Sequence, residues 1–137
     1  MRICLDTNVL VSAALEPDSD SAKLLARLAE IDVLIPAQVM KELVRNLSDD
    51  LFQQIYDDLH RRTTTLSFAS ESLPGDLIAR YVAKGLSIKG DAVIAAFAEH
   101  FGVEAIVSLN RDFLRLARGP FEVLTPQELL DRLDLGG

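Results

Sequence analysis

The fold is decided near the start of the chain, where residues 2–8 read RICLDTN. Ile3, Cys4 and Leu5 form an unbroken apolar run, which is typical of a short strand that is buried on both faces. The polar residues DTN then end the strand abruptly. A strand of this kind indicates a parallel sheet that is covered by helices on both sides.

The same pattern returns further along the chain, at residues 33–35 (VLI) and 105–107 (AIV), with weaker strands expected at 63–68 and 121–124. Helical patterns fill the segments between them. They are expected at 7–15, after a cap at Ser19 or Ser21, from Pro36 to 47, and at 49–62, 74–84, 92–101, 110–117 and 125 onward. Strands that alternate with helices predict an α/β fold. We expect a three-layer α/β/α domain with a central, mostly parallel sheet of four or five strands.

The 137 residues fit a single domain, 1–137, with 49% apolar residues for its core. One cysteine excludes an internal disulfide and suits a reducing cytosol. Asp6 and Asn8 interrupt the apolar start, which argues against a signal peptide, and no segment is suited to span a membrane. These features predict a cytoplasmic protein.

The formal charge of −7 has the wrong sign for a protein that holds nucleic acid by its overall field. Either nucleic acid is not the substrate, or metal ions and a local basic patch make the contact.

Four carboxylates follow or precede the predicted strands. Asp6 comes directly after the first strand, Glu42 lies about one helical turn after the second, and Asp112 follows the third. Asp91 opens the helix that leads into the third strand. Because ligands bind beyond the carboxyl ends of the strands in such sheets, these four side chains are expected to converge on one rim.

Each carboxylate also has a purely structural reading. Asp6 and Asp91 are good helix caps, Glu42 could be a solvated helix residue, and Asp112 could favour a helix dipole. The joint pattern is stronger, and competing motifs such as CxxC, HExxH, GxSxG and a Walker loop do not occur in the sequence. Nothing supports a cysteine or serine nucleophile.

Five segments, in order, resemble the motifs of PIN-domain nucleases, and in particular VapC-like toxins of bacterial toxin–antitoxin pairs. They are DTN after the first strand, Glu42, GDAVIAA at 90–96, VSLNRDFL at 107–114 and VLTPQELL at 123–130. The resemblance spans essentially the whole chain. It implies a PIN-like fold, hydrolysis of RNA to a 5′-phosphate and a 3′-hydroxyl, and a cognate antitoxin.

Two features depart from the family. Many relatives carry an extra acidic residue beside the third motif, where this chain has Ser87, Lys89 and Gly90. In the fourth motif either Asn110 or Asp112 could be the nearer ligand. A thinner acidic cluster would lower the activity.

Oxygen ligands without histidine or thiolate suit Mg²⁺ or Mn²⁺. We expect Asp6, Asp91 and Asp112 to be metal ligands and Glu42 to hold a second ion or orient water. Side chains expected to hold these carboxylates and water in place are Thr7, Asn8, Ser108 and Asn110. Candidate RNA contacts are Lys41, Arg45, Lys89 and Arg111.

Other functions stay open. The chain could be a PIN-like interaction module with weak or no catalysis, or a Mg²⁺-dependent aspartyl phosphatase with Asp6 as the nucleophile. The phosphatase usually needs a second aspartate where Asn8 stands. Helices over residues 23–30 and 39–59 have enough apolar character to form a homodimer or to bind an antitoxin helix.

Overall fold

The structure, a computed structural model, describes residues 1–62, 66–69, 73–87, 90–116 and 119–135. Within these ranges one sheet has five parallel strands in the order β3-β2-β1-β4-β5. The strands are β1 (Arg2–Leu5), β2 (Asp32–Pro36), β3 (Leu66–Ala69), β4 (Ala105–Val107) and β5 (Glu122–Leu124). The predicted α/β class and the four or five mostly parallel strands are confirmed.

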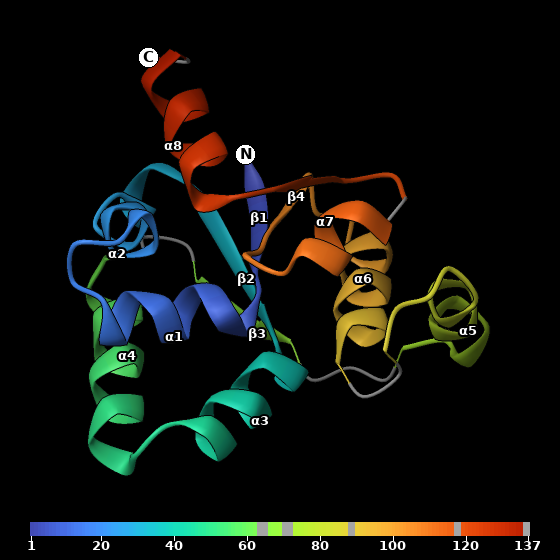
Figure 1. Cartoon of the computed structure of the whole chain (residues 1–137), viewed down its shortest axis with the longest axis horizontal. Helices are drawn as coiled ribbons and strands as arrows, with labels where there is room; N and C mark the ends of the chain where they lie inside the picture. Colours follow the sequence, from blue (N-terminus) through green and yellow to red (C-terminus); the bar gives the residue numbers. More distant parts are fainter. Residues whose placement is uncertain (63–65, 70–72, 88–89, 117–118, 136–137) are drawn as a thin grey trace.

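Helices cover both faces of this sheet. Figure 1 shows α1, α2 and α4 on one side of the strands and α5 and α6 on the other, which makes the predicted three layers. The described helices are α1 (Thr7–Leu15), α2 (Asp20–Leu25), the 3₁₀ turn η1 (Leu28–Glu30), α3 (Ala37–Asn46), α4 (Asp49–Arg62), α5 (Gly75–Ala83), α6 (Asp91–His100), α7 (Arg111–Leu116) and α8 (Pro126–Leu135). None of these described helices combines the length and apolar character needed to cross a membrane.

Local sequence explains most of the helix boundaries. Ser19 caps α2 by accepting a hydrogen bond from the Ala22 amide at 3.1 Å. Thr125 and Glu128 form a reciprocal capping box at the start of α8, with bonds of 3.0 and 3.1 Å. Pro36 differs from expectation, since it ends β2 and stands just before α3 rather than inside its first turn.

The edge strand expected at residues 63–68 is β3, which starts at residue 66 and pairs with β2. Residues 63–65 lie outside the described part of the chain. The other expected strands and helices are found within a few residues of their predicted limits.

The strand order creates a crevice at the carboxyl ends of β1 and β4. From β1 the chain moves outward through β2 to β3, then returns past β1 to β4 and β5. Connections after β1 and β4 therefore leave in opposite directions, which is where an α/β sheet binds its ligand. The Asp6 amide donates to the Val107 carbonyl at 2.9 Å, which extends the β1–β4 pairing to this crevice.

Candidate active site

Asp6 stands at the centre of the crevice, between the ends of β1 and β4. Its side chain is only 3% exposed. One carboxylate oxygen, Oδ1, accepts from the Thr7 amide at 2.8 Å, and the other, Oδ2, accepts from the Ser108 hydroxyl at 2.7 Å. Asp6 is thus the N-cap of α1 and is also hydrogen-bonded to Ser108, the residue that follows β4. Its role as a helix cap is therefore compatible with its predicted place in a site.

This position makes ionisation of Asp6 unfavourable. Burial, followed by the negative charges of Asp91 and Glu42, raises the pKa of Asp6 from its ordinary 3.8 to about 6, although hydrogen bonds from Ser108 and Thr7 act to lower it. Two carboxylates from distant parts of the chain therefore lie within electrostatic reach of Asp6.

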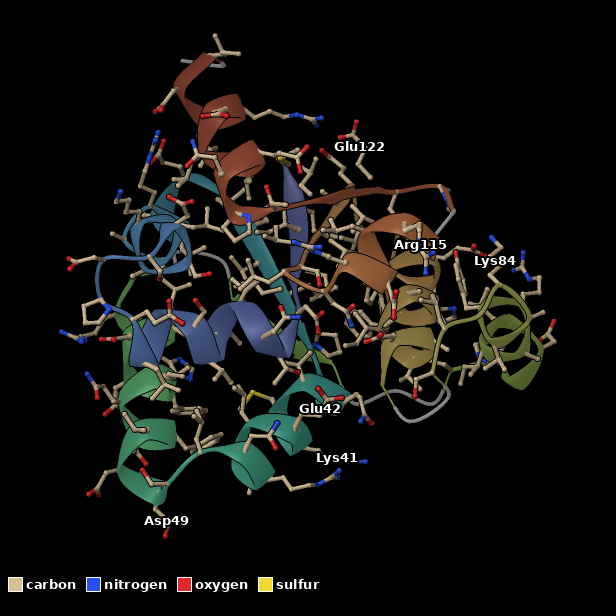
Figure 2. The ribbon with its side chains drawn as sticks, viewed as in Figure 1. Lys41, Glu42, Asp49, Lys84, Arg115 and Glu122 are labelled. Atoms are coloured by element: carbon tan, nitrogen blue, oxygen red, sulfur yellow. The ribbon has the colours of Figure 1, made fainter. Side chains whose placement is uncertain are left out.

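Glu42 reaches the crevice from α3. Its Oε2 accepts from the Thr7 hydroxyl at 2.5 Å, and its Oε1 accepts from the Gln38 amide at 3.1 Å. Glu42 lies near the middle of α3, and Figure 2 shows it on the side of that helix toward α6, with Lys41 pointing outward from the same helix. These contacts make Glu42 a fixed part of the crevice and not a freely solvated side chain.

Asp91 is the first residue of α6 and faces the same crevice. Its Oδ2 accepts a hydrogen bond from the side-chain amide of Asn110 at 3.0 Å. Partial burial raises the pKa of Asp91, and the charges of Glu42 and Asp112 add to this effect, while the bond from Asn110 opposes it.

These side chains line one open cavity of about 410 Å³. Its walls are Asp6, Thr7, Asn8, Val11, Glu42, Asn46, Asp91 and Asn110. No lysine or arginine among the described residues belongs to this wall. Three carboxylates that are not neutralised by a basic side chain leave a deficit of positive charge, which a bound cation would relieve.

The donor set suits a hydrated magnesium ion better than a fully enclosed one. Within the described ranges, no three His, Cys, Asp or Glu side chains lie close enough together to enclose a metal ion. Mg²⁺ normally keeps several waters and takes only one or two carboxylates, together with substrate phosphate. Asp6 and Asp91, with Glu42 acting directly or through water, supply oxygen donors of that kind.

Asp112 does not line this cavity. Its side chain is 69% exposed and accepts a hydrogen bond from Arg115 at 3.0 Å. Figure 2 shows Arg115 on α7, well separated from Glu42. Asp112 acts on the crevice only through its charge, whereas Asn110 enters the wall itself.

The polar residues predicted around the carboxylates all make specific bonds. Asn8 Oδ1 accepts from the Leu109 amide at 3.1 Å, which fixes the loop after β4. Ser108 Oγ also accepts from the backbone amide of Asn110 at 3.0 Å. Asn110 Oδ1 in turn caps α7 by accepting from the backbone amide of Asp112 at 2.9 Å. One chain of bonds therefore joins Asp6 to Asp91 through Ser108 and Asn110.

Sequence reasoning missed three contributors: Gln38, Asn46 and Gly90. Gln38 lies four residues before Glu42, so a helical spacing rule could have identified it as a partner. Asn46 lies one further turn along α3 from Glu42 and lines the cavity. Gly90 was named only as the first residue of the segment GDAVIAA, and the sequence does not show that it lies against the Glu42 carboxylate.

The candidate RNA contacts lie outside the cavity. Lys41 and Arg45 are exposed on α3, where they flank a surface hollow that also includes Met40, Val44 and Phe52. Arg111 is exposed at the start of α7. Lys89 lies outside the described residues.

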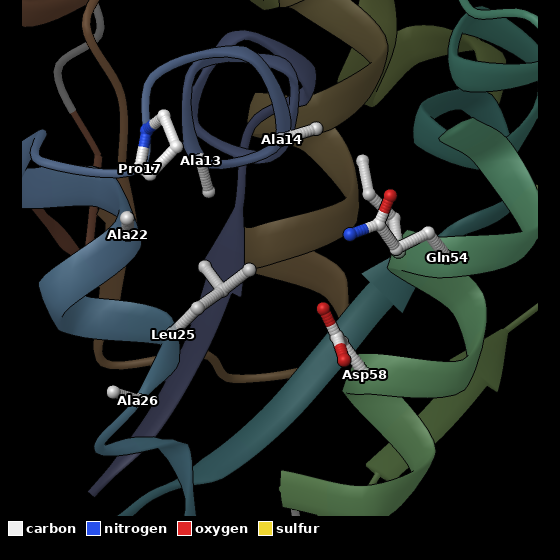
Figure 3. A pocket seen from close by; sticks show the side chains of 9 residues that line it. Ala13, Ala14, Pro17, Ala22, Leu25, Ala26, Gln54 and Asp58 are labelled. Atoms are coloured by element: carbon white, nitrogen blue, oxygen red, sulfur yellow. The ribbon is translucent and has the colours of Figure 1, made fainter.

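A second cavity, of about 290 Å³, lies between α1, α2 and α4. Figure 3 shows Leu25 of α2 and Gln54 and Asp58 of α4 around the space beside α1. Its wall is otherwise mostly small and apolar: Ala13, Ala14, Pro17, Ala22, Ala26 and Ile55.

Comparisons with known proteins support the fold described above. The sequence matches the PIN domain family model over residues 3–119. No curated protein matches the chain.

Three solved structures illustrate the similarity. VapBC2 from Rickettsia felis, bound to a DNA fragment from its promoter, has 21% identity and a TM-score of 0.66, covering 91% of this chain and 98% of that one. PAE2754 from Pyrobaculum aerophilum has 20% identity and a TM-score of 0.62, covering 98% and 96%. The sarcin–ricin-loop-cleaving toxin VapC20 of Mycobacterium tuberculosis has 17% identity and a TM-score of 0.60, covering 86% and 97%.

Proposed function

The chain belongs to the PIN domain family, and from this premise we propose that it is a divalent-metal-dependent endoribonuclease, the toxin of a bacterial toxin–antitoxin pair. The observation that carries the proposal is the buried carboxylate of Asp6, at the meeting point of β1 and β4, in one cavity with Glu42 and Asp91. Such a constellation needs a cation, and cation-assisted phosphodiester hydrolysis is the chemistry that it suits.

Asp6 and Asp91 would hold Mg²⁺ or Mn²⁺, with Glu42 as a further ligand or as the group that orients water. The bound ion would supply Lewis-acid activation of the phosphate and lower the pKa of an attacking water. Ser108 and Asn110 keep the carboxylates of Asp6 and Asp91 turned as they are, through hydrogen bonds of 2.7 and 3.0 Å.

The RNA backbone would approach along α3. Lys41 and Arg45 are one turn apart on an exposed stretch of the helix that also carries Glu42. Phosphate contacts with these side chains would offset the acidic field of the whole chain, −7, locally. The exposed Arg111 could make a similar contact from α7.

An antitoxin segment would be the second partner. The support for this partner is that the fold of the chain is similar to that in VapBC2, which resembles the toxin–antitoxin pairs considered above. The cavity between α1, α2 and α4 has room for an apolar side chain, with the polar groups of Gln54 and Asp58 beside it. A homodimer through residues 39–59 stays a prediction. It would cover Val44, which is 60% exposed.

Incubation of the protein with total RNA, with and without Mn²⁺ or Mg²⁺, tests the proposal. We expect fragments with 5′-phosphates only when the metal is present. Asp6→Asn should abolish cleavage while the fold survives, and Asp131→Asn, the same change on the exposed side of α8, should leave it intact. Equal cleavage by the wild-type and Asp6→Asn proteins would refute the site.

The outward position of Asp112 favours one alternative, an interaction module with weak catalysis, because it leaves three carboxylates in the cavity wall. Absence of both metal binding and RNA cleavage in the wild-type protein would support that alternative. Metal-dependent release of phosphate from a phosphomonoester, without RNA cleavage, would instead support the phosphatase.

A further inference from the structure

Gly90 lies directly against the carboxylate of Glu42. A Cβ atom built on Gly90 would stand 2.8 Å from Glu42 Oε1 and 3.8 Å from Glu42 Cδ. Real Cβ atoms do not approach an oxygen atom so closely, so any side chain at this position would have to displace the carboxylate. The displacement is easy, because the carboxylate is the end of a flexible side chain.

Glu42 is held against Gly90 from two other directions. The Thr7 hydroxyl donates to Oε2 from the start of α1, and the Gln38 amide donates to Oε1 from the preceding turn of α3. The Glu42 carboxylate thus lies between the Thr7 hydroxyl, the Gln38 side chain and the backbone of Gly90.

Gly90 supplies only backbone groups to its own helix, where its carbonyl accepts a hydrogen bond from the Ile94 amide at 3.0 Å. It is the N-cap of α6, and it makes no side-chain capping bond. Serine, aspartate or asparagine at an N-cap would satisfy a free amide of the first turn. Glycine is also accepted at an N-cap, so the missing side chain of Gly90 costs α6 little, and the close approach to Glu42 is what distinguishes this position.

We propose that Gly90 is a positioning residue, whose missing side chain lets the Glu42 carboxylate reach the cavity beside Asp91. This inference rests on the proposed function for its consequence, which is the placement of Glu42 toward metal and water. Gly90 itself touches neither.

The test is a double-mutant cycle with Gly90→Ser and Glu42→Ala. Serine is a favoured N-cap residue, so the change adds side-chain atoms while α6 keeps a residue type suited to its start, and the melting temperature of the variant checks that the fold is retained. Displacing a group that orients ligands typically weakens metal affinity or activity about 10- to 100-fold. We expect a loss of this size for Gly90→Ser, measured as Mn²⁺ affinity by calorimetry and as kcat for RNA cleavage.

In the Glu42→Ala background the loss caused by Gly90→Ser should vanish, because there is no carboxylate left to displace. Gly75→Ser is the matched control, since a Cβ at Gly75 would meet no atom within 4 Å. It should leave both quantities unchanged.

Wild-type Mn²⁺ affinity and kcat in Gly90→Ser would overturn the inference, and so would an undiminished loss in the Glu42→Ala background. If the wild-type protein neither binds Mn²⁺ nor cuts RNA, the proposed function fails separately. A crystal structure of Gly90→Ser then decides the placement. Loss of the Thr7–Glu42 bond supports the inference, and its retention overturns it.

Discussion

Asp6 carries a negative charge at a position from which water is almost excluded. A rise in pKa from 3.8 to about 6 corresponds to roughly 3 kcal/mol of unfavourable free energy for the ionised carboxylate, as an upper limit. Such a group weakens the metal-free fold and gains most from a cation. Under the proposed function, the negative charge of Asp6 would serve metal binding at a cost to the stability of the metal-free protein.

Asp6→Asn should consequently raise the melting temperature of the metal-free protein at pH 7–8. Asparagine can still accept from the Thr7 amide, and its own amide can donate to the Ser108 hydroxyl. The expected gain is on the order of 1–3 kcal/mol in the free energy of unfolding, measured by thermal or urea denaturation.

The stability that the protein gains from Asp6→Asn should be larger at high pH than at low pH. The folded state binds the Asp6 proton more tightly than the unfolded state, so the wild-type protein loses stability as pH rises from about 4 to about 6. The advantage of Asp6→Asn should be full above this window and disappear below it. A constant difference between the two proteins from pH 4 to pH 8 would contradict the assignment.

Asp91 and Asp112 offer a comparison by the same chemical change. Asp91→Asn removes a charge from the cavity wall and should lower kcat/KM for RNA by at least about 100-fold, whereas Asp112→Asn should lower it less than about 10-fold. The reason is that Asp112 is exposed and paired with Arg115. Equal losses in a metal-dependent cleavage assay would restore Asp112 as a ligand.

Residue types at strand ends were the most predictable part of the site. Asp6, Ser108 and Asn110 follow β1 or β4 directly, so the topology alone brings them together. Asp112 was harder to place, because a shift of two residues around the first turn of α7 turns a side chain from the cavity to solvent. Gly90 was named only as part of a motif, since its contact with Glu42 of α3 depends on the tertiary fold.

Helix α3 carries an acidic side chain that faces the cavity and basic side chains that face solvent. Glu42 faces the cavity and is half-buried, while Lys41 and Arg45 are exposed. Because neighbouring positions on a helix point in different directions, charge of both signs is tolerated within five residues.

Replacing both Lys41 and Arg45 by alanine should weaken RNA binding without changing Mn²⁺ affinity. Each lost phosphate contact should reduce the slope of log affinity against log salt by about 1. Binding is best measured in the Asp6→Asn background, where RNA stays intact. Lys23→Ala is the control, since Lys23 is exposed on α2, away from the cavity. An unchanged salt slope would exclude this path for RNA.

The capping box of α8 offers a stability test that is independent of function. Thr125→Ala removes the acceptor for the Glu128 amide and should cost about 1 kcal/mol. The melting temperature should fall by about 4 °C, with Mn²⁺ affinity unchanged. A loss of Mn²⁺ affinity would show that α8 is coupled to the cavity, against the present account.

Strands were predictable because the central strands β1 and β4 are apolar at every buried position, as burial on both faces requires. The edge strand β3 was the least certain in its limits, since the β-branched residues at 63–65 extend the sequence pattern to positions outside the described part of the chain. Pro36 shows the opposite case, in which a good helix-start residue completes a strand first.

The molecule as a whole combines an acidic surface charge with an acidic cavity. Strand order predicts where the cavity lies, because the only reversal of direction in the described sheet falls between β1 and β4. The net charge of −7 argued against a nucleic-acid substrate. Under the proposed function, a cation bound in the cavity, whose described wall has no basic side chain, would answer that objection and supply the positive charge that the site needs.

The measurement that tests this requirement most directly is the melting temperature of the protein as Mn²⁺ is added. A ligand at 100 times its dissociation constant stabilises the folded state by about 2.7 kcal/mol. We predict a saturable increase in the wild-type melting temperature and none in Asp6→Asn. No increase in the wild-type protein, or the same increase in both, would contradict a cation site built on Asp6.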